Sequence, residues 1–538
     1  MKRELRNNLL LLFASILFSL LFLEIGLRIF ISYQQRYFIV EAMDGIQYYR
    51  SNPNSSVISS GQSFLKNKPE GTYRIFTFGG STTEGSIHGG KVSFSRFLKW
   101  NLENLLPSVP IEIINFGKAG EASRDVLRKV KIALKYEPDL FIIYSGHNEF
   151  IRFDETSITH PGWIEELFNH FYLYKRLFKR SSGSFFDQTP LYLSESRTLE
   201  DKLVCTPEEF GRVQEEYKRN IQDIVRVAKD ANVDIILSTV VGNYKGWEPN
   251  RSVHKKNLSD KELERWRYYY SSGKEFYEKE DFESAIEEFE LAQKIDPTFA
   301  ELNFRLGKSY EQVGRFKDAK REYSSAADNE GDPKIASTLF NEMIKKTCLD
   351  HKIPCVDVVT AFESVSENSL IGYNIMVDAH HPSIFGELVI AKEIVEVMAN
   401  NKLPVPAAQW SFDHDKPDKW YLTRPDLTGD DDVLYHQNRG LWFAKLSSRR
   451  YDPEDRLKRA KYHFEEARKI DPTSFRTYIG FAVLDLLEKK PLQAIDQIQK
   501  TCEINPAGTV KILKDRWISN LFLKNQIQVN GKCQIETL

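Results

Sequence analysis

A spacing of 34 residues recurs in the middle of this chain. Small and aromatic residues share it: Gly273, Phe276, Ala285, Phe289 and Ala292 recur 34 residues later as Gly307, Tyr310, Ala319, Tyr323 and Ala326. The small residues suit places where paired helices touch, and the aromatic residues fill the space around them. We therefore expect stacked pairs of helices in this region, where each pair contacts only its neighbours.

This spacing resembles that of the tetratricopeptide (TPR) repeat, and we expect TPR helices over residues 260–333. A second block near the carboxyl end shows the same step, because Ala460 recurs as Ala494 and Pro472 as Pro506. We expect TPR-like repeats over residues 451–510. Ordinary amphipathic helices are the alternative, and for the second block both interpretations stay open. The resemblance implies that the repeats bind a protein partner along a concave surface.

Five short apolar runs lie on either side of the first repeat block. They span Arg74–Gly80, Ile111–Gly117, Leu140–Gly146, Asp234–Val241 and Pro354–Val359. Longer amphipathic stretches separate them, as in a parallel sheet whose strands are covered on both faces. One stretch has a helix start, where Thr206 can cap, Pro207 suits the first helical position and Glu209 completes a capping box. We expect an α/β domain in two parts, residues 71–250 and 334–402.

Residues that can carry chemistry follow these runs, at the ends where parallel sheets bind ligands. Ser81 follows the first run, Gly117 and Gly120 follow the second, and Asn148 follows the third. The turn at Ser81 could instead cradle a phosphate group, but no lysine follows its second glycine as the phosphate-binding pattern requires.

Asp378 and His381 lie three residues apart near the end of the domain. This spacing lets the carboxylate orient one imidazole nitrogen while the other nitrogen faces a serine. His147 and His380 are alternative histidines for the site, but the DxxH spacing selects His381.

Together these segments resemble the SGNH (GDSL-type) hydrolase superfamily, over about half the chain. The resemblance implies a flavodoxin-like domain with a five-stranded parallel sheet. It also implies that Ser81 is the nucleophile, His381 its general base and Asp378 the residue that fixes the imidazole tautomer. An oxyanion hole would then contain the backbone amides of Ser81 and Gly120 and the side chain of Asn148.

Two motifs depart from the superfamily pattern. GDS is here GGS, and GxND is here GHNE. Gly80 stands where the pattern has an aspartate whose carboxylate usually braces the turn. This change puts the rigidity of the turn in question more than the chemistry.

The amino terminus carries a membrane signal. Three cations precede a largely apolar run over residues 9–31, which as a helix would extend about 34 Å, enough for a hydrocarbon core of about 30 Å. A cleaved signal peptide is the alternative, but no A-x-A site follows. We expect a transmembrane anchor over residues 1–35, with the amino terminus cytoplasmic and the hydrolase domain extracytoplasmic.

Charge and cysteine content exclude other classes. The 74 lysine and arginine residues nearly balance the 76 aspartate and glutamate residues, so we expect no nucleic-acid partner. The five cysteines lack CxxC pairs, which argues against a zinc site or a redox dithiol, and we expect no metal and no cofactor. Cys348 and Cys355 can pair in an oxidising compartment, with buried free thiols as the alternative.

The resemblance implies an esterase or deacylase that acts through an acyl-enzyme on an acylated small molecule or glycan. If a sugar hydroxyl replaces water, the same residues give an O-acyltransferase of cell-surface polysaccharide. A TPR scaffold with an inactive hydrolase domain is the third hypothesis. The remaining segments are expected to be a linker over residues 36–70, a connector over residues 403–450 and a tail over residues 511–538.

Overall fold

The computed structural model describes residues 15, 18–19, 21–26, 37–53, 55, 58, 61–88, 90, 92–150, 207–249, 251–424, 427, 430–447 and 453–537. They divide into two compact units. The first contains Met1–Ser86 and Ser93–Lys416, and the second contains Ile87–Val92 and Pro417–Leu538.

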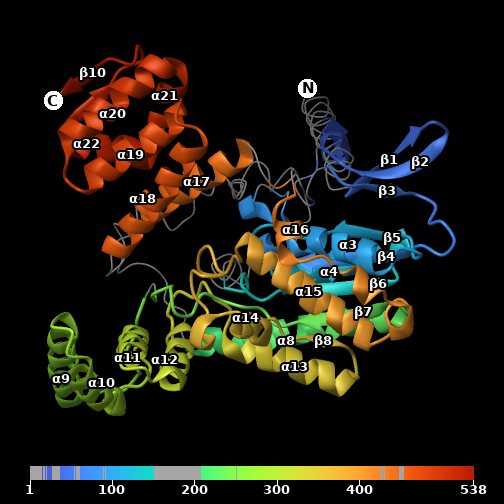
Figure 1. Ribbon diagram of the computed structural model, residues 1–538, viewed down its shortest axis with the longest axis horizontal. Coiled ribbons are helices and arrows are strands. Elements are labelled where there is room, and N and C mark those ends of the chain that lie inside the picture. The colour runs from blue at the N-terminus through green and yellow to red at the C-terminus, as the bar shows by residue number, and fades with distance from the viewer. Residues whose placement is uncertain are drawn as a thin grey trace, which may run out of the picture. The chain divides into compact units, whose positions relative to one another are not determined.

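The first unit is built on a five-stranded sheet. Its strands are β4 (Tyr73–Gly79), β5 (Ile111–Asn115), β6 (Leu140–Tyr144), β7 (Asp234–Ser238) and β8 (Cys355–Val356). All neighbours pair in parallel, in the order β5-β4-β6-β7-β8 (Figure 1). Renumbered along the chain this order is 2-1-3-4-5, the flavodoxin-like order. The five predicted strands and their parallel arrangement are confirmed.

Two groups of helices pack around this sheet. In one group α15 (Ile384–Asn400) contacts α3 (Phe94–Leu105) and α14 (Val358–Ser364). In the other, α8 (Pro207–Asp230) contacts α4 (Ser123–Ala133) and α13 (Thr338–His351). Every residue of β6 is buried, as expected for a strand covered on both faces. The predicted helix at Pro207 is present, whereas its predicted cap, Thr206, lies outside the described residues.

A small antiparallel sheet precedes the parallel one, where a linker over residues 36–70 was expected. It contains β1 (Phe38–Met43), β2 (Ile46–Ser51) and β3 (Ser63–Leu65). Aromatic rings hold it to the domain, because Phe38 and Phe64 pack edge-on against Tyr136 at centroid distances of 5.2 and 5.9 Å. The aromatic residues in these short runs carry enough apolar surface to order the segment.

Four helices form the insertion between β7 and β8 (Figure 1). They are α9 (Asp260–Glu278), α10 (Phe282–Ile295), α11 (Ala300–Gln312) and α12 (Phe316–Asp328). The repeated glycines lie beneath the repeated rings: a Cβ on Gly273 would be 2.5 Å from Phe289 Cδ1, and one on Gly307 would be 2.8 Å from Tyr323 Cδ1. The helix pairs expected from the 34-residue spacing are therefore present.

The second unit is mostly helical. Its elements are α16 (Asp418–Leu422), α17 (Asp430–Ser447), α18 (Pro453–Ile470), α19 (Phe475–Leu487), α20 (Pro491–Ile504), α21 (Pro506–Leu513), α22 (Arg516–Lys524), β9 (Ile527–Val529) and β10 (Ile535–Thr537). The expected connector thus contains α17, which packs on α18. The sequence signal for this helix packing, which the sequence analysis missed, is Gly440, where a Cβ would be 2.6 Å from the Phe464 ring.

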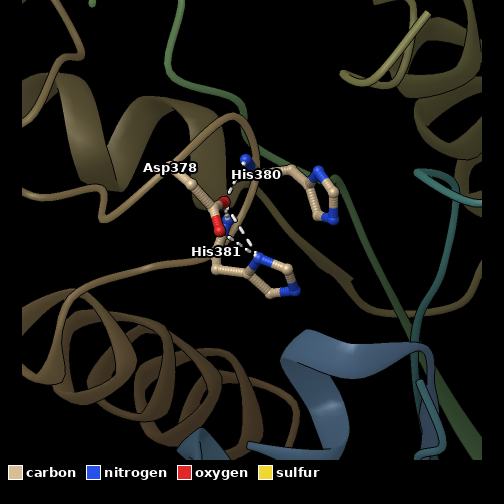
Figure 2. Close-up of side chains that lie close together, drawn as sticks. All are labelled: Asp378, His380 and His381. Carbon is tan, nitrogen blue, oxygen red and sulfur yellow. Dashed lines mark hydrogen bonds and ion pairs between the residues drawn. The ribbon is translucent and has the colours of Figure 1, made fainter. Parts of the chain in front are cut away.

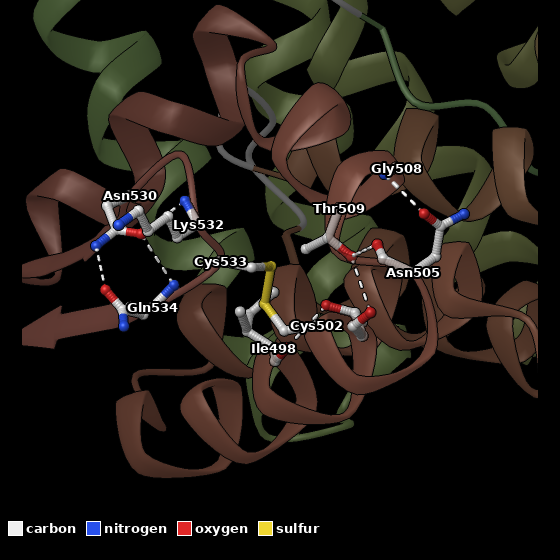
Figure 3. Close-up of a disulfide and its surroundings, with 10 residues drawn as sticks. Ile498, Cys502, Asn505, Gly508, Thr509, Asn530, Lys532, Cys533 and Gln534 are labelled. Carbon is white, nitrogen blue, oxygen red and sulfur yellow. Dashed lines mark hydrogen bonds between the residues drawn. A yellow bond between two sulfur atoms is a disulfide. The ribbon is translucent and has the colours of Figure 1, made fainter.

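The expected tail over residues 511–538 is also ordered. A disulfide joins Cys533 to Cys502 of α20, with a Cα–Cα distance of 5.7 Å (Figure 3). The tail therefore returns to the helical block and is covalently fixed there. Cys348 and Cys355 are free thiols.

Short 3₁₀ helices complete the described chain at Ser86–His88, Leu134–Tyr136, Glu367–Ser369, Ala407–Gln409 and Phe412–His414. Most of the expected anchor over residues 1–35 lies outside the described residues, and those described within it are helical. Among the residues that the structure describes, none of the helices has the length and hydropathy needed to cross a membrane.

Candidate active site

Ser81 lies at the carboxyl end of β4, where the chain turns into the short helix α2 (Ser81–Glu84). The Oγ of Ser81 is 2.6 Å from Nε2 of His381, although 300 positions separate the two residues. Nδ1 of the same ring is 2.9 and 2.8 Å from the two carboxylate oxygens of Asp378. The structure thus brings hydroxyl, imidazole and carboxylate into one continuous line of hydrogen bonds.

The loop that carries Asp378 and His381 is held by the same carboxylate. The backbone amides of His380 and His381 donate to Asp378 Oδ1 at 3.1 and 3.0 Å (Figure 2). Ser383 then caps α15, since Gly386 N donates to its Oγ. Asp378 therefore fixes both the loop backbone and the orientation of the imidazole ring.

Asn148, one of the predicted oxyanion donors, lies beside Ser81. Ser81 and Asn148 line one small pocket, together with Gly80 and Glu121. Gly120 precedes Glu121 and has a φ of 77°, a left-handed conformation that suits glycine. Asn148 Nδ2 donates one hydrogen to Glu121 O at 2.9 Å. Its second amide hydrogen is available for a ligand, because each side-chain amide carries two.

The unusual Gly80 has a steric reason. A Cβ at this position would lie 2.4 Å from Nδ2 of Asn148, so the asparagine amide occupies the space that a larger residue needs. The bracing carboxylate comes from Glu84, one turn later. Its Oε2 accepts from Ala119 N at 2.8 Å, and its Oε1 is 2.7 Å from Lys118 Nζ. Glu84 thus ties the serine turn to the loop before Gly120, a role that sequence analysis did not assign.

Two further buried carboxyl groups support these loops. Glu149, in the position of the aspartate in GxND, accepts from Ser123 N and Ser123 Oγ, both at 2.8 Å. Burial raises the pKa of Glu149 to about 7. Burial also raises the pKa of Glu121 to about 7, against the opposing effect of its ion pair with Lys129. The Glu149 carboxyl group thus holds the backbone at Ser123, whereas the Glu121 carboxyl group is paired with Lys129.

The other two candidate histidines form a separate pair. The rings of His147 and His380 stack with centroids 4.8 Å apart, and both residues line the pocket beside Ser81. Burial lowers the pKa of His380 to about 3 and places the pKa of His147 well below its usual value. Both rings are therefore neutral, and His381 alone of the three histidines contacts the serine hydroxyl.

Asp378, His380 and His381 also have ligand atoms within 4.8 Å of one another, a spacing that could suit a metal ion. His381, however, uses Nδ1 for Asp378 and Nε2 for Ser81. A metal ion bound to this ring would break one of those two bonds, so the observed arrangement suits proton transfer. The expectation that no metal or cofactor takes part stays a prediction.

Comparisons with known proteins give two findings. A family model described as TPR repeat matches residues 273–314. The inserted block contains a TPR repeat. A comparison with curated protein sequences gave no match.

Similar solved structures include two esterases or lipases. The acetylxylan esterase Axe2 from Geobacillus stearothermophilus has 13% identity and a TM-score of 0.29, covering 61% of this chain and 94% of that chain. A GDSL-like lipase from Bacteroides thetaiotaomicron has 13% identity and a TM-score of 0.28, covering 61% of this chain and 88% of that chain.

Proposed function

We propose that this protein is a serine hydrolase that cleaves ester bonds through an acyl-enzyme intermediate. The observation that carries the proposal is the connected line from Ser81 Oγ through His381 to Asp378. His381 Nε2 accepts the hydroxyl proton while Ser81 Oγ bonds to the ester carbonyl carbon. The protonated ring then gives its proton to the departing alcohol oxygen.

The second half of the reaction uses the same groups. His381 takes a proton from water, the hydroxide oxygen bonds to the acyl carbon, and the proton returns to Ser81 as the acid leaves. Asp378 keeps the Nδ1 hydrogen of His381 directed towards itself, so Nε2 faces the serine. The amides of Ser81, Gly120 and Asn148 stabilise the negative charge on the carbonyl oxygen, where one donor is worth about 3 kcal/mol.

Covalent labelling tests this function. A fluorophosphonate probe should label the wild-type protein, and Ser81→Ala should remove both labelling and hydrolysis of a chromogenic acetyl ester. The matched control is Ser364→Ala, because Ser364 is an exposed serine on α14. Unchanged labelling of Ser81→Ala would remove Ser81 from the mechanism. A glycan acceptor that diverts the acyl group from water would identify the O-acyltransferase alternative.

We further propose that the protein is anchored in a membrane with its hydrolase domain outside the cytoplasm. The Cys502–Cys533 disulfide supports this location, since such bonds persist in oxidising compartments. Phe18, Leu21 and Phe22, within the apolar run, are exposed, as suits contact with lipid. The test fuses to the carboxyl terminus a reporter enzyme of a kind that works only in the cytoplasm. Activity of this reporter would contradict the proposed topology.

The TPR block is proposed to bind a protein partner. It forms helix pairs whose buried residues face one another, including Ala285, Leu306 and Ala319. Stacked helix pairs of this kind present a surface for peptides or proteins. An inactive hydrolase domain carried by a TPR scaffold would be indicated by partner binding together with no labelling of Ser81.

A further inference from the structure

Ser145 Oγ, at the pocket beside Ser81, has no hydrogen-bond partner among the described residues. Two buried imidazole nitrogens at the same pocket also have none. They are Nε2 of His147 and Nδ1 of His380. Both side chains line the pocket that Ser81 lines. Buried polar atoms in proteins are nearly always hydrogen-bonded, so an unpaired pair at one pocket indicates a ligand group that completes them.

The hydrogen on His147 can be placed from its neighbour. Its Nδ1 accepts a hydrogen bond from the backbone amide of Ala336 at 3.1 Å. A backbone amide can only donate, so Nδ1 carries the lone pair. Because the neutral imidazole has one N–H, that hydrogen lies on Nε2, which makes the unpaired atom of His147 a donor.

The same reasoning gives the opposite result for His380. Its ring hydrogen-bonds to the backbone of Lys334, and this contact favours the protonated ring, as donation to a carbonyl does. Since Nδ1 is the unpaired atom, the donor to Lys334 is Nε2. The free Nδ1 therefore carries a lone pair and is an acceptor.

The two rings are also fixed in place next to the reacting pair. His147 and His380 stack at 4.8 Å, and His380 lies 4.2 Å from the ring of His381. Figure 2 shows the ring of His380 turned away from Asp378, while the ring of His381 lies against that carboxylate. His380 is thus excluded from the proton relay and faces the pocket.

We propose that His147 and His380 form a subsite for one hydroxyl group, in which His147 Nε2–H donates to the hydroxyl oxygen and His380 Nδ1 accepts the hydroxyl hydrogen. The proposal rests on the ester chemistry proposed for Ser81. A hydroxyl is both donor and acceptor, so it satisfies both atoms at once. The substrate class is then a partly acylated polyol or carbohydrate, with a free hydroxyl near the ester.

Matched esters test this subsite in the full-length protein. The substrates are 2-hydroxyethyl acetate and 2-methoxyethyl acetate, in which a methyl group replaces the hydrogen that the terminal oxygen can donate. We expect kcat/KM for the hydroxy ester to exceed that for the methoxy ester by about tenfold, the value of one hydrogen bond to a buried acceptor. Equal values in wild-type protein that cleaves both esters would overturn the proposal and indicate that the pocket binds only water.

Variants assign the preference to the two rings. His147→Phe and His380→Phe keep an aromatic ring but remove the donor or the acceptor. Because only the hydroxy ester can donate to His380, His380→Phe should reduce the hydroxy-to-methoxy ratio towards one. His147→Phe removes a donor that both ester oxygens can use, so it should lower kcat/KM for both esters. The control is His414→Phe, which changes an exposed histidine and should keep the wild-type ratio. A preference that survives in folded His380→Phe, or kcat/KM values that are unchanged in folded His147→Phe, would contradict the assignment. If a variant fails to fold, the other variant and the wild-type ratio still decide.

The hydroxyl group bound by the subsite can belong to the ester or to an acyl acceptor. A further experiment with an added acceptor distinguishes these two sources. Added glycerol should speed release of the acyl group in wild-type protein if the subsite also binds an acceptor, and the two Phe variants should lose this effect. Failure of the underlying chemistry is distinguishable, because then neither ester is cleaved and a fluorophosphonate does not label Ser81.

Discussion

The carboxyl edge of the sheet and the inserted TPR helices both depend on glycines beneath larger groups, but the groups differ in kind. In the insertion, Gly307 lies beneath the ring of Tyr323. At the sheet edge, Gly80 lies beneath the amide of Asn148. The first arrangement lets two helices approach, and the second brings a polar donor close to Ser81, the proposed nucleophile. Changes in the insertion should therefore alter stability, whereas changes at the edge should alter catalysis.

The largest expected effect is at Asp378. In Asp378→Asn the remaining side-chain oxygen still accepts the amides of His380 and His381, but the amide cannot stabilise a protonated His381. We expect kcat to fall by roughly a thousandfold or more, with little change in the thermal midpoint. Stopped-flow hydrolysis of a chromogenic acetyl ester measures this. Asp413→Asn, at a largely exposed carboxylate, is the control.

Gly307→Ala tests the expectation that changes in the inserted helices alter stability. The new methyl group would be 2.8 Å from Tyr323, and such overpacking costs about 1–3 kcal/mol of unfolding free energy. Gly211→Ala is a matched control in helix α8, because a Cβ there meets no atom within 4 Å. Thermal unfolding followed by circular dichroism should separate the two variants. A Gly307→Ala protein that stays folded but loses esterase activity would break the distinction between the two regions.

Glu84→Ala tests the brace between the serine turn and the loop before Gly120. It removes the acceptor for Ala119 N and the partner of Lys118. Since a small displacement of catalytic groups lowers the rate strongly, we expect kcat to fall about tenfold, with KM much less affected. Glu103→Ala, an exposed carboxylate in α3, should leave the steady-state constants near wild type.

The last prediction concerns pH. Burial raises the pKa of Glu149 from 4.5 to about 7, so the folded state holds a proton that the unfolded state has released between these values. Its contribution to stability is therefore largest at low pH and declines as pH rises to about 7, by up to about 1.4 kcal/mol per unit. Glu149→Gln should reduce this slope in unfolding measurements from pH 5 to 7. Glu121 has a shift of the same direction, so part of the slope should remain.

Local patterns were sufficient to predict much of this fold. Four of the five parallel strands lie within the predicted runs and β4 begins one residue before its run, because buried strands are marked by continuous apolar residues between turns. The 34-residue spacing likewise placed the inserted helices. Ser81, Asp378 and His381 were chosen as candidates because each belongs to a short motif, and the structure brings them within hydrogen-bonding distance.

The features that sequence analysis missed depend on contacts between distant segments. Nothing in the local sequence distinguishes Glu84 from the other glutamates, because its role depends on the loop at Ala119 that folds against it. The sheet of β1 to β3 is ordered by packing on rings such as Tyr136, and no periodic pattern in the local sequence indicates this contact. The partner of Cys502 cannot be read from spacing, since several pairings of five cysteines are compatible with one sequence.

Rapid-quench mass spectrometry of the peptide that contains Ser81 tests the central claim most directly. Mixed with an acetyl ester and quenched within the first turnover, wild-type protein should carry one acetyl group on Ser81, and the Ser81→Ala protein should carry none. An acetyl group found only on another residue, or ester hydrolysis by Ser81→Ala at the wild-type rate, would contradict the proposed serine chemistry.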